Sequence, residues 1–298
     1  MNQIKLTVII PHYQSADTLE KCLLSIPVRE EIQILIVDDK SPDIEQWESL
    51  KCKFPLFTFI RLEKNGGAGS ARNAGLRLAQ GKWLVFADAD DYFLPDAFDC
   101  FKDYYDSKAD IVFFKSQSWE VVQNMATNRH LKRSGFVVRY INGEKGAEDN
   151  LRYRWHCPWG KMIRKSMVDE CHLVFDETMY SNDAMFSIKA GYYARLIEAD
   201  RREVYCVTVS PNSLTKKVNY ESIMCRYRVL GNCNNFLKSV GEAKNQMVAL
   251  RYFIIAFKYE RKCIVPMIKY SLKNHISIFA GLNKWSEFFQ FNTKFSHF

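Results

Sequence analysis

Three aspartates stand within four positions of one another in this chain: Asp88, Asp90 and Asp91 follow the apolar run from Trp83 to Ala87. The run is long enough for one buried strand. Carboxylates at the end of a buried strand repel one another and lose solvation, so they need a compensating cation. Oxygen ligands favour a hard ion such as Mg²⁺ or Mn²⁺, and such ions commonly bring a phosphate with them. The alternative is an acidic surface turn whose aspartate caps the next helix, and this segment alone does not separate the two.

The elements that must position these aspartates alternate between apolar runs and amphipathic segments. Strands are expected at 6–10, 32–37, 57–62, 83–87 and 111–114, and helices from about 17 to 26 and over 70–79. Gly81 is a stop signal for the second of these helices. Strands alternating with helices indicate βαβ units, and therefore an α/β fold with a mostly parallel sheet flanked by helices.

Polar clusters follow three of the expected strands. They are His12-Tyr13, Asp38-Asp39 and the aspartates that begin at Asp88. In open parallel sheets, ligands bind beyond the carboxyl ends of the strands. The agreement of three clusters in that place favours a nucleotide site over an acidic turn.

A glycine-rich segment, Asn65-Gly-Gly-Ala-Gly-Ser-Ala-Arg72-Asn73, lies between the third and fourth expected strands. Small residues let the backbone approach a ligand, and the helix that follows is expected to offer unpaired N–H groups to anions. The segment is neither a Walker loop nor a GxGxxG motif. The alternative is a flexible turn before a helix.

Taken together, the motifs resemble the nucleotide-binding half of the family 2 glycosyltransferases with the GT-A fold. The segments that carry the resemblance occur in the family's order: Val8–Tyr13, Ile34–Asp39, Asn65–Gly75 and Phe86–Asp91. The match is close over residues 5–95 and looser to about 215. It implies a nucleotide-sugar donor, a divalent ion (Mn²⁺ or Mg²⁺) and a single displacement that inverts the anomeric carbon.

The resemblance also assigns roles to individual residues. Asp90 is the expected metal ligand, and Asp91 is expected to orient the donor sugar or support the metal site. Tyr13 can stack on a nucleobase, and Asp39 can accept the imide N–H of uracil, which cytosine lacks. Arg72 is the expected partner of the diphosphate. The nucleotide-binding set is Pro11, His12, Tyr13, Asp39, Asn65, Gly66, Arg72, Asp88 and Ala89, with Asp88 at the ribose.

An inverting transferase needs a base for the acceptor hydroxyl. The family usually supplies it from a Glu-Asp pair before a helix; here Asn182 replaces the glutamate and Asp183 is the expected base. Upstream, Trp159 is expected to stack on the acceptor, with Trp155 as the other candidate, and Lys161 to lie near the donor sugar, a phosphate or the acceptor. Ordinary core packing remains the leading alternative for such a tryptophan. His156 is left out as a metal ligand, since a lone histidine is more often structural.

Charge divides the chain into two parts. The whole chain has a net charge of +8: residues 1–215 carry a net −2, and residues 216–298 carry a net +10. The same C-terminal segment contains 15 aromatic residues. We therefore expect a GT-A catalytic domain over 1–215, with a nucleotide-binding half at 1–115 and an acceptor half at 116–215. Residues 216–298 are expected to form a basic helical region. That region suits either an anionic membrane surface or a helical bundle packed on the catalytic domain.

The predicted function is metal-dependent transfer of a sugar from a nucleotide-sugar donor, expected to be a UDP-sugar, to a glycan or lipid-linked glycan acceptor. No signal peptide or spanning helix is expected, and nine cysteines without a CxxC pair favour a reducing compartment, so the predicted location is cytoplasmic, with peripheral contact at the inner membrane face. The alternatives are a nucleotidyltransferase, which would need a glycine-rich loop after the first strand, and a non-catalytic nucleotide-sugar-binding scaffold. No nucleic-acid recognition motif is present, so a nucleic-acid partner is not expected.

Overall fold

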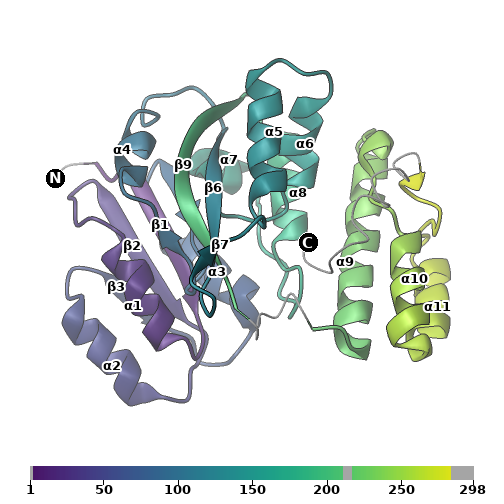
Figure 1. Cartoon of the computed structure of the whole chain (residues 1–298), viewed down its shortest axis with the longest axis horizontal. Coiled ribbons are helices and arrows are strands. Elements are labelled where there is room, and N and C mark those ends of the chain that lie inside the picture. The colour runs from purple at the N-terminus through teal and green to yellow at the C-terminus, as the bar shows by residue number, and fades with distance from the viewer. Residues whose placement is uncertain (1–2, 211–216, 283–298) are drawn as a thin grey trace. The chain divides into compact units, whose positions relative to one another are not determined.

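The computed structural model describes residues 3–210 and 217–282, which form two compact units (Figure 1). Of the described residues, the first unit comprises 3–177 and 186–210, and the second comprises 178–185 and 217–282. The predicted boundary at 215/216 falls in a stretch outside the described residues. The assignment of 178–185 to the second unit was not predicted.

A mixed sheet forms the centre of the first unit. Its order is β3-β2-β1-β4-β8-β6-β9-β5, with β7 paired to β6. The strands are β1 (Leu6–His12), β2 (Ile32–Asp38), β3 (Thr58–Arg61), β4 (Trp83–Phe86), β5 (Tyr92–Phe93), β6 (Ile111–Glu120), β7 (Met125–Ala126), β8 (Lys161–Arg164) and β9 (Ile197–Val209). The β3-β2-β1-β4 part is parallel as predicted, whereas β8 pairs antiparallel with both β4 and β6.

Helices flank this sheet. They are α1 (Ala16–Leu24), α2 (Ile44–Lys53), α3 (Gly67–Leu78), α4 (Ala97–Lys102), α5 (Leu131–Ile141), α6 (Ala147–Arg154), α7 (Lys165–Glu170) and α8 (Ala184–Tyr193). Figure 1 shows α5 and α6 side by side, and α5 packs on β6 and β9. The helix expected at 70–79 begins three residues earlier, inside the glycine-rich segment, and α2 was not predicted.

Close packing between α3 and β1 explains one glycine of that segment. A Cβ atom on Gly75 would lie 2.5 Å from Cγ2 of Ile9, which is closer than packed carbon atoms approach. The absence of a side chain at Gly75 therefore lets α3 lie directly on the strand that leads into the site.

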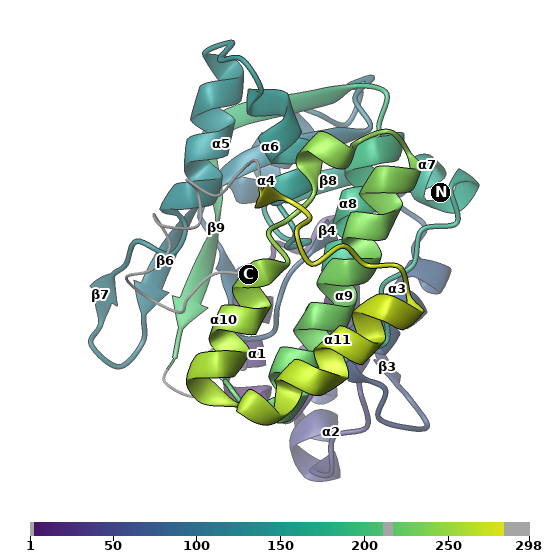
Figure 2. The same cartoon turned by 90° about the vertical axis from the view of Figure 1, so that its right-hand side faces the viewer.

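The second unit contains α9 (Tyr220–Ser239), α10 (Leu250–Tyr259) and α11 (Ile264–Lys273), joined by the short helices η2 (Ala243–Asn245) and η3 (Arg261–Cys263). Figure 2 shows α10 and α11 lying against α9, and Tyr227 and Tyr252 are buried among them. Pro266 lies in the first turn of α11, where its missing N–H has no intrahelical partner to lose. Across 3–210 and 217–282, no helix is both long and apolar enough to cross a bilayer.

Candidate functional site

The ends of the three central strands lie side by side. In the parallel register His12 of β1 pairs with Asp38 of β2, and the Asp39 N–H donates to the His12 carbonyl at 2.8 Å. Beyond β4, the Ala87 N–H donates to the Ile9 carbonyl at 3.2 Å. The polar clusters that follow these strands therefore meet at one edge of the sheet, as predicted.

The aspartates after β4 form a compact carboxylate cluster. One ligand oxygen from each of Asp88, Asp90 and Asp91 lies within 4.8 Å of the others. Asp90 is exposed and Asp91 is buried. Partial desolvation and the charge of Asp88 raise the pKa of Asp90 to about 6, and burial with two neighbouring carboxylates raises the pKa of Asp91 as well. The raised pKa values mean that negative charge here is incompletely compensated. An all-oxygen donor set of this kind fits a hard divalent cation such as Mg²⁺ or Mn²⁺.

Strand β9 holds this cluster in place, and the sequence did not reveal it. Asp91 is buried, and its Oδ1 accepts from the Thr208 N–H at 2.7 Å, while the Thr208 hydroxyl donates to the Asp90 carbonyl at 2.6 Å. The Asp88 N–H donates to the phenolic oxygen of buried Tyr205 at 2.8 Å. These contacts follow from the pairing of β5 with β9, which joins Phe93 to Tyr205. No local signal in the sequence predicts that pairing.

Arg72 lies on the buried face of α3 and reaches the same cluster. Its Nη2 donates to Oδ1 of Asp88 at 2.6 Å, and its guanidinium lies 5.4 Å from the ring of Phe175. The ion pair orients the guanidinium at the edge where the resemblance expects a diphosphate. Its role with that diphosphate stays a prediction.

The structure places Asp39 at the start of α3. Its two carboxylate oxygens accept from the N–H groups of Gly66 at 2.8 Å and Gly67 at 2.7 Å, and Nδ2 of Asn65 donates to its carbonyl. The expectation that these helix N–H groups are unpaired and available to an anion is therefore wrong for Gly66 and Gly67. The proposed uracil contact of Asp39 stays a prediction.

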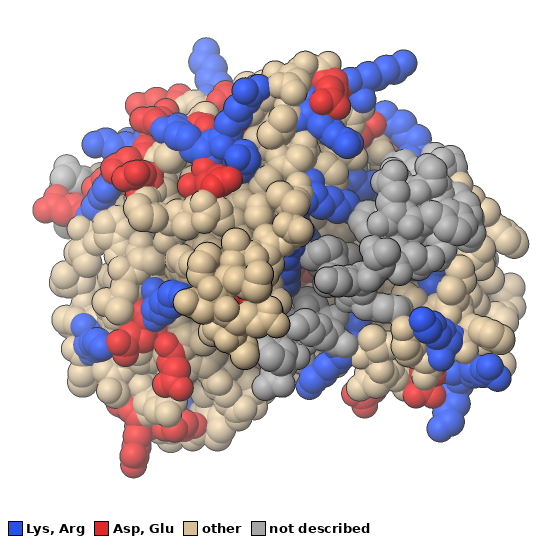
Figure 3. Space-filling model, in the orientation of Figure 1, with Lys and Arg blue, Asp and Glu red and all other residues tan. Residues whose placement is uncertain are grey.

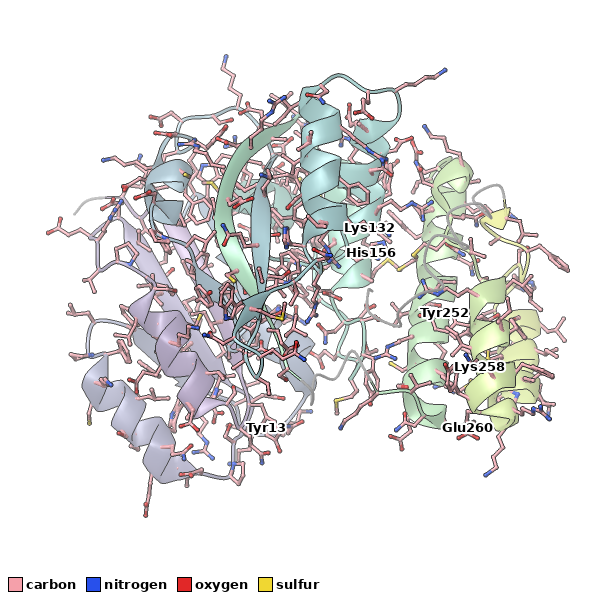
Figure 4. The ribbon with its side chains drawn as sticks, viewed as in Figure 1. Tyr13, Lys132, His156, Tyr252, Lys258 and Glu260 are labelled. Carbon is pink, nitrogen blue, oxygen red and sulfur yellow. The ribbon has the colours of Figure 1, made fainter. Side chains whose placement is uncertain are left out.

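The residues at the end of β1 differ in exposure. Pro11 and His12 are inside the strand, and the His12 ring is buried and stacked on Trp47 at 5.7 Å. Burial lowers the pKa of His12, and its Nδ1 lies 2.9 Å from the Ser15 hydroxyl. Tyr13, in contrast, is 47% exposed just beyond the strand (Figure 4). An exposed ring is unlike a core residue and leaves a face for a base; the nucleobase contact stays a prediction.

Trp159 and Lys161 are both buried. Trp159 stacks on the ring of Tyr205 at 5.6 Å with planes 15° apart. Lys161 lies within the core, where its ammonium donates to the Trp155 carbonyl at 2.9 Å. These contacts give both side chains a packing role, and their expected contacts with acceptor and donor sugar stay predictions.

Asp183 directly precedes α8, as the sequence predicts. Beside it, Nδ2 of Asn182 donates to the Thr178 carbonyl at 3.3 Å. These residues belong to the second unit, and the role of Asp183 as base stays a prediction.

Curated relatives of this chain include glycosyltransferases. The chain is 27% identical over 222 residues to "Uncharacterized glycosyltransferase EpsJ" of Bacillus subtilis, covering 70% of this chain and 62% of the relative. It is 26% identical over 237 residues to "Uncharacterized glycosyltransferase YibD" of Escherichia coli, covering 73% and 67%. The match thus spans less than two thirds of the length of EpsJ.

Solved structures share the fold. S. aureus TarS 1–349 in complex with UDP-GlcNAc superposes with a TM-score of 0.65 at 20% identity, covering 87% of this chain and 74% of TarS. The mannosyltransferase PcManGT from Pyrobaculum calidifontis, in complex with GDP-Man and Mn²⁺, gives a TM-score of 0.59 at 15% identity, covering 99% and 83%. The predicted GT-A fold, with its mixed sheet, flanking helices and helical C-terminal region, is confirmed.

The family model described as "Glycosyl transferase family 2" matches residues 7–171. This range is more than half of the chain, and it contains both the strand-end clusters and the glycine-rich segment. The chain belongs to glycosyl transferase family 2.

Proposed function

We propose that this protein transfers a sugar from a UDP-sugar to a hydroxyl of a glycan or lipid-linked glycan, with inversion at the anomeric carbon. The observation that carries the proposal is the carboxylate cluster, whose ligand oxygens lie within 4.8 Å of one another beside Arg72. In this proposal Asp90 holds Mn²⁺ or Mg²⁺, Asp88 reaches the ribose, and Asp91 keeps the loop in place through Thr208.

Relatives and neighbours support the substrate class. One curated relative, 34% identical over 101 residues, is named poly(ribitol-phosphate) beta-glucosyltransferase, and TarS and PcManGT bind UDP-GlcNAc and GDP-Man. Both ligands are nucleoside diphosphate sugars. We favour uracil as the base, because each Asp39 oxygen accepts one glycine N–H and keeps a second lone pair for the imide N–H of uracil.

The residues of the cluster suit the charge change of the reaction. When the sugar leaves, negative charge grows on the departing diphosphate, and a bound divalent ion supplies compensating positive charge. Arg72 adds a fixed positive charge at the same edge, already oriented by Asp88. Asp183 would take the proton of the acceptor hydroxyl, a contribution of about 10²–10⁴-fold to the rate.

A thermal-shift panel tests the donor assignment. The intact protein is heated with UDP, GDP or CMP, each with and without Mn²⁺, and UDP with Mn²⁺ is expected to raise the melting temperature most. Asp90→Asn should lose the Mn²⁺-dependent part of this shift. No shift with any nucleotide would refute the donor assignment.

Turnover assays separate a transferase from a non-catalytic scaffold. Mn²⁺-dependent hydrolysis of the UDP-sugar, measured as UDP release, is expected for the wild type. Asp183→Asn should abolish transfer to acceptor and leave the UDP thermal shift unchanged. Near-normal transfer by that variant would remove Asp183 as base.

We also propose that the α10–α11 hairpin contacts an anionic membrane surface. Exposed apolar side chains recur on it at helical spacing: Ile254, Phe257, Val265, Ile268 and Leu272. Exposed basic side chains lie on and between the same helices: Lys258, Arg261, Lys262, Lys269 and Lys273. Blue surface gathers at the lower right of Figure 3, on the side where Figure 4 labels Lys258. Apolar side chains mixed with cations suit the interface of an anionic bilayer, where each Lys or Arg contributes about 1 kcal/mol.

Liposome flotation tests the membrane contact. The double variant Phe257→Ser/Leu272→Ser should float less with phosphatidylglycerol vesicles than the wild type. Leu56 of the first unit is as exposed as Leu272, at 74%, so Leu56→Ser is a matched control that should float normally. Equal flotation of the double variant and the wild type would remove this role from the hairpin.

A further inference from the structure

Arg133, in the first turn of α5, differs from the other little-exposed arginines of the first unit. It is 6% exposed, and its guanidinium lies 4.9 Å above the ring of Trp159. Its Nε is buried and has no hydrogen-bond partner among the described residues, which also give its guanidinium no ion pair. Arg72, Arg152 and Arg164, by comparison, each pair with a carboxylate.

Stacking on an indole leaves the donors of a guanidinium available. The cation–π contact uses the face of the guanidinium plane, whereas all five N–H groups point outward in that plane. A buried donor without an acceptor destabilises the folded protein, so binding an acceptor there is favourable. A planar fork of unused donors on a rigid aromatic support is the geometry that recognises phosphate or carboxylate in two parallel hydrogen bonds.

The surroundings of Arg133 are positively charged. The half-buried His156, which follows α6, has a pKa lowered to about 3, first by desolvation and then by the charges of Arg154, Lys132 and Arg133. Figure 4 shows Lys132 and His156 close together. His156 is therefore neutral at physiological pH, and Arg133 lies among other cations that act on the same imidazole.

Two aromatic layers connect Arg133 to the carboxylate cluster. Trp159, below Arg133, stacks on Tyr205, and the Tyr205 hydroxyl accepts from the Asp88 N–H. At the turn before α5, Arg129 donates to the Thr208 carbonyl at 3.3 Å, and its charge lowers the pKa of Asp90. Arg133 therefore lies two aromatic layers from the carboxylate cluster, while the expected diphosphate partner, Arg72, lies on another helix.

We propose that Arg133, supported by Trp159, binds an oxyanion of the acceptor, so that the acceptor is a phosphate- or carboxylate-bearing alcohol. This inference rests on the proposed function, because a second anion site belongs to the acceptor only if the carboxylate cluster binds the donor. The shared chemistry is a tetrahedral or planar oxyanion close to the hydroxyl that receives the sugar.

Binding measurements on the full-length protein, preloaded with UDP and Mn²⁺, test the proposal. Preloading fills the donor diphosphate site, so any further anion binding reports a different site. The probes are glycerol 1-phosphate, glycerate and uncharged glycerol, each titrated by calorimetry. We expect one or both anions to bind at least tenfold more tightly than glycerol, and the better anion identifies the acceptor class.

Variants assign the binding to Arg133. Arg133→Met should weaken the better anion at least tenfold, and Arg133→Lys should recover part of the loss, because lysine keeps the charge without the fork. Arg139→Met is the matched control, since Arg139 is on the same helix but exposed, and it should bind as the wild type does. A normal UDP thermal shift in each variant shows that it is folded.

Equal binding of anions and glycerol by the wild type, or unchanged anion binding by both Arg133 variants, would overturn the proposal. Failure of the wild type to bind UDP with Mn²⁺ is a separate result, which would refute the donor assignment instead.

Discussion

Aspartates follow two strands that lie on either side of β1, yet the two sets have different surroundings. After β2, Asp38 accepts from the N–H and hydroxyl of Ser41 and lies 3.5 Å from Nε of Arg61, and Asp39 accepts from two glycine N–H groups. After β4, the carboxylates of Asp90 and Asp91 face each other and Asp88, and their pKa values are raised.

The comparison shows that the partners of a strand-end aspartate distinguish its functions. Carboxylates whose oxygens are already hydrogen-bonded hold the backbone together, as at β2. Carboxylates that lie together with too few hydrogen-bond donors need a cation to compensate their negative charge, as after β4. Substitutions that remove charge should therefore lower stability at the first site, in addition to any loss of the proposed uracil contact of Asp39, and should affect mainly ligand binding at the second.

The largest effect is expected for Asp90→Asn. Losing this ligand should reduce Mn²⁺-dependent UDP-sugar turnover by about 10³-fold, which corresponds to roughly 4 kcal/mol of transition-state stabilisation. Steady-state UDP release at saturating Mn²⁺ measures the loss. The metal-free variant should melt at or above the melting temperature of the wild type, since one repelling charge is gone. A variant that is both active and less stable would show that Asp90 stabilises the fold and does not bind the metal.

The next effect is expected for Asp39→Asn. An amide presents only one oxygen, so it cannot accept from both Gly66 and Gly67, and its own N–H groups face one of them. The free energy of unfolding should fall by about 1–3 kcal/mol, measured by chemical denaturation. Asp43→Asn is the control, because Asp43 caps α2 in an exposed position where asparagine caps equally well.

A smaller effect is expected for Tyr205→Phe, which probes the support of the cluster. The Asp88 N–H loses its acceptor, and we expect the protein to lose about 1–2 kcal/mol of stability and to bind Mn²⁺ several-fold more weakly. Tyr104→Phe removes a hydroxyl bonded to Asp200 in the same unit. That control should lose stability without a change in Mn²⁺ affinity, and equal Mn²⁺ affinities in the two variants would contradict a supporting role for Tyr205.

The smallest effect concerns pH. The folded-state pKa of Asp90, about 6, lies above its ordinary value of 3.8, so its ionised form destabilises the metal-free fold above pH 6, and protonation relieves this between about pH 6 and pH 4. The melting temperature of Asp90→Asn should exceed that of the wild type at pH 7.5, and the difference should shrink by pH 5. A difference that widens as the pH falls would show that the pKa of Asp90 is not raised.

Periodicity and strand-end residues predicted much of the first unit. The apolar runs at 6–10, 32–37 and 83–87 are strands because both faces of a central parallel strand are buried, and that leaves a clear pattern. The prediction for α3 began three residues late, since Gly67 and Gly69 are poor helix formers in isolation. Hydrogen bonds from Gly66 and Gly67 to Asp39, which no local pattern reveals, support the start of this helix.

The residues that complete the site were harder to predict. Tyr205 and Thr208 meet the aspartates only because β5 pairs with β9, more than 100 residues later in the chain. Arg133 likewise belongs to no motif, and it is a candidate only because folding buries it against Trp159 without an ion pair among the described residues. Such contacts depend on tertiary structure, whereas each strand-end cluster could be read from a few adjacent residues.

The long separation between β5 and β9 has a consequence for how this protein folds. Pairing Asp39 with the glycine N–H groups closes a short loop, whereas joining Asp91 to Thr208 closes one of more than 100 residues, at a greater cost in chain entropy. Contacts of high sequence separation tend to form late. A growing or refolding chain should therefore complete its β1–β4 layer first and become able to capture a cation only when β9 arrives, which makes metal affinity a reporter of the last folding step.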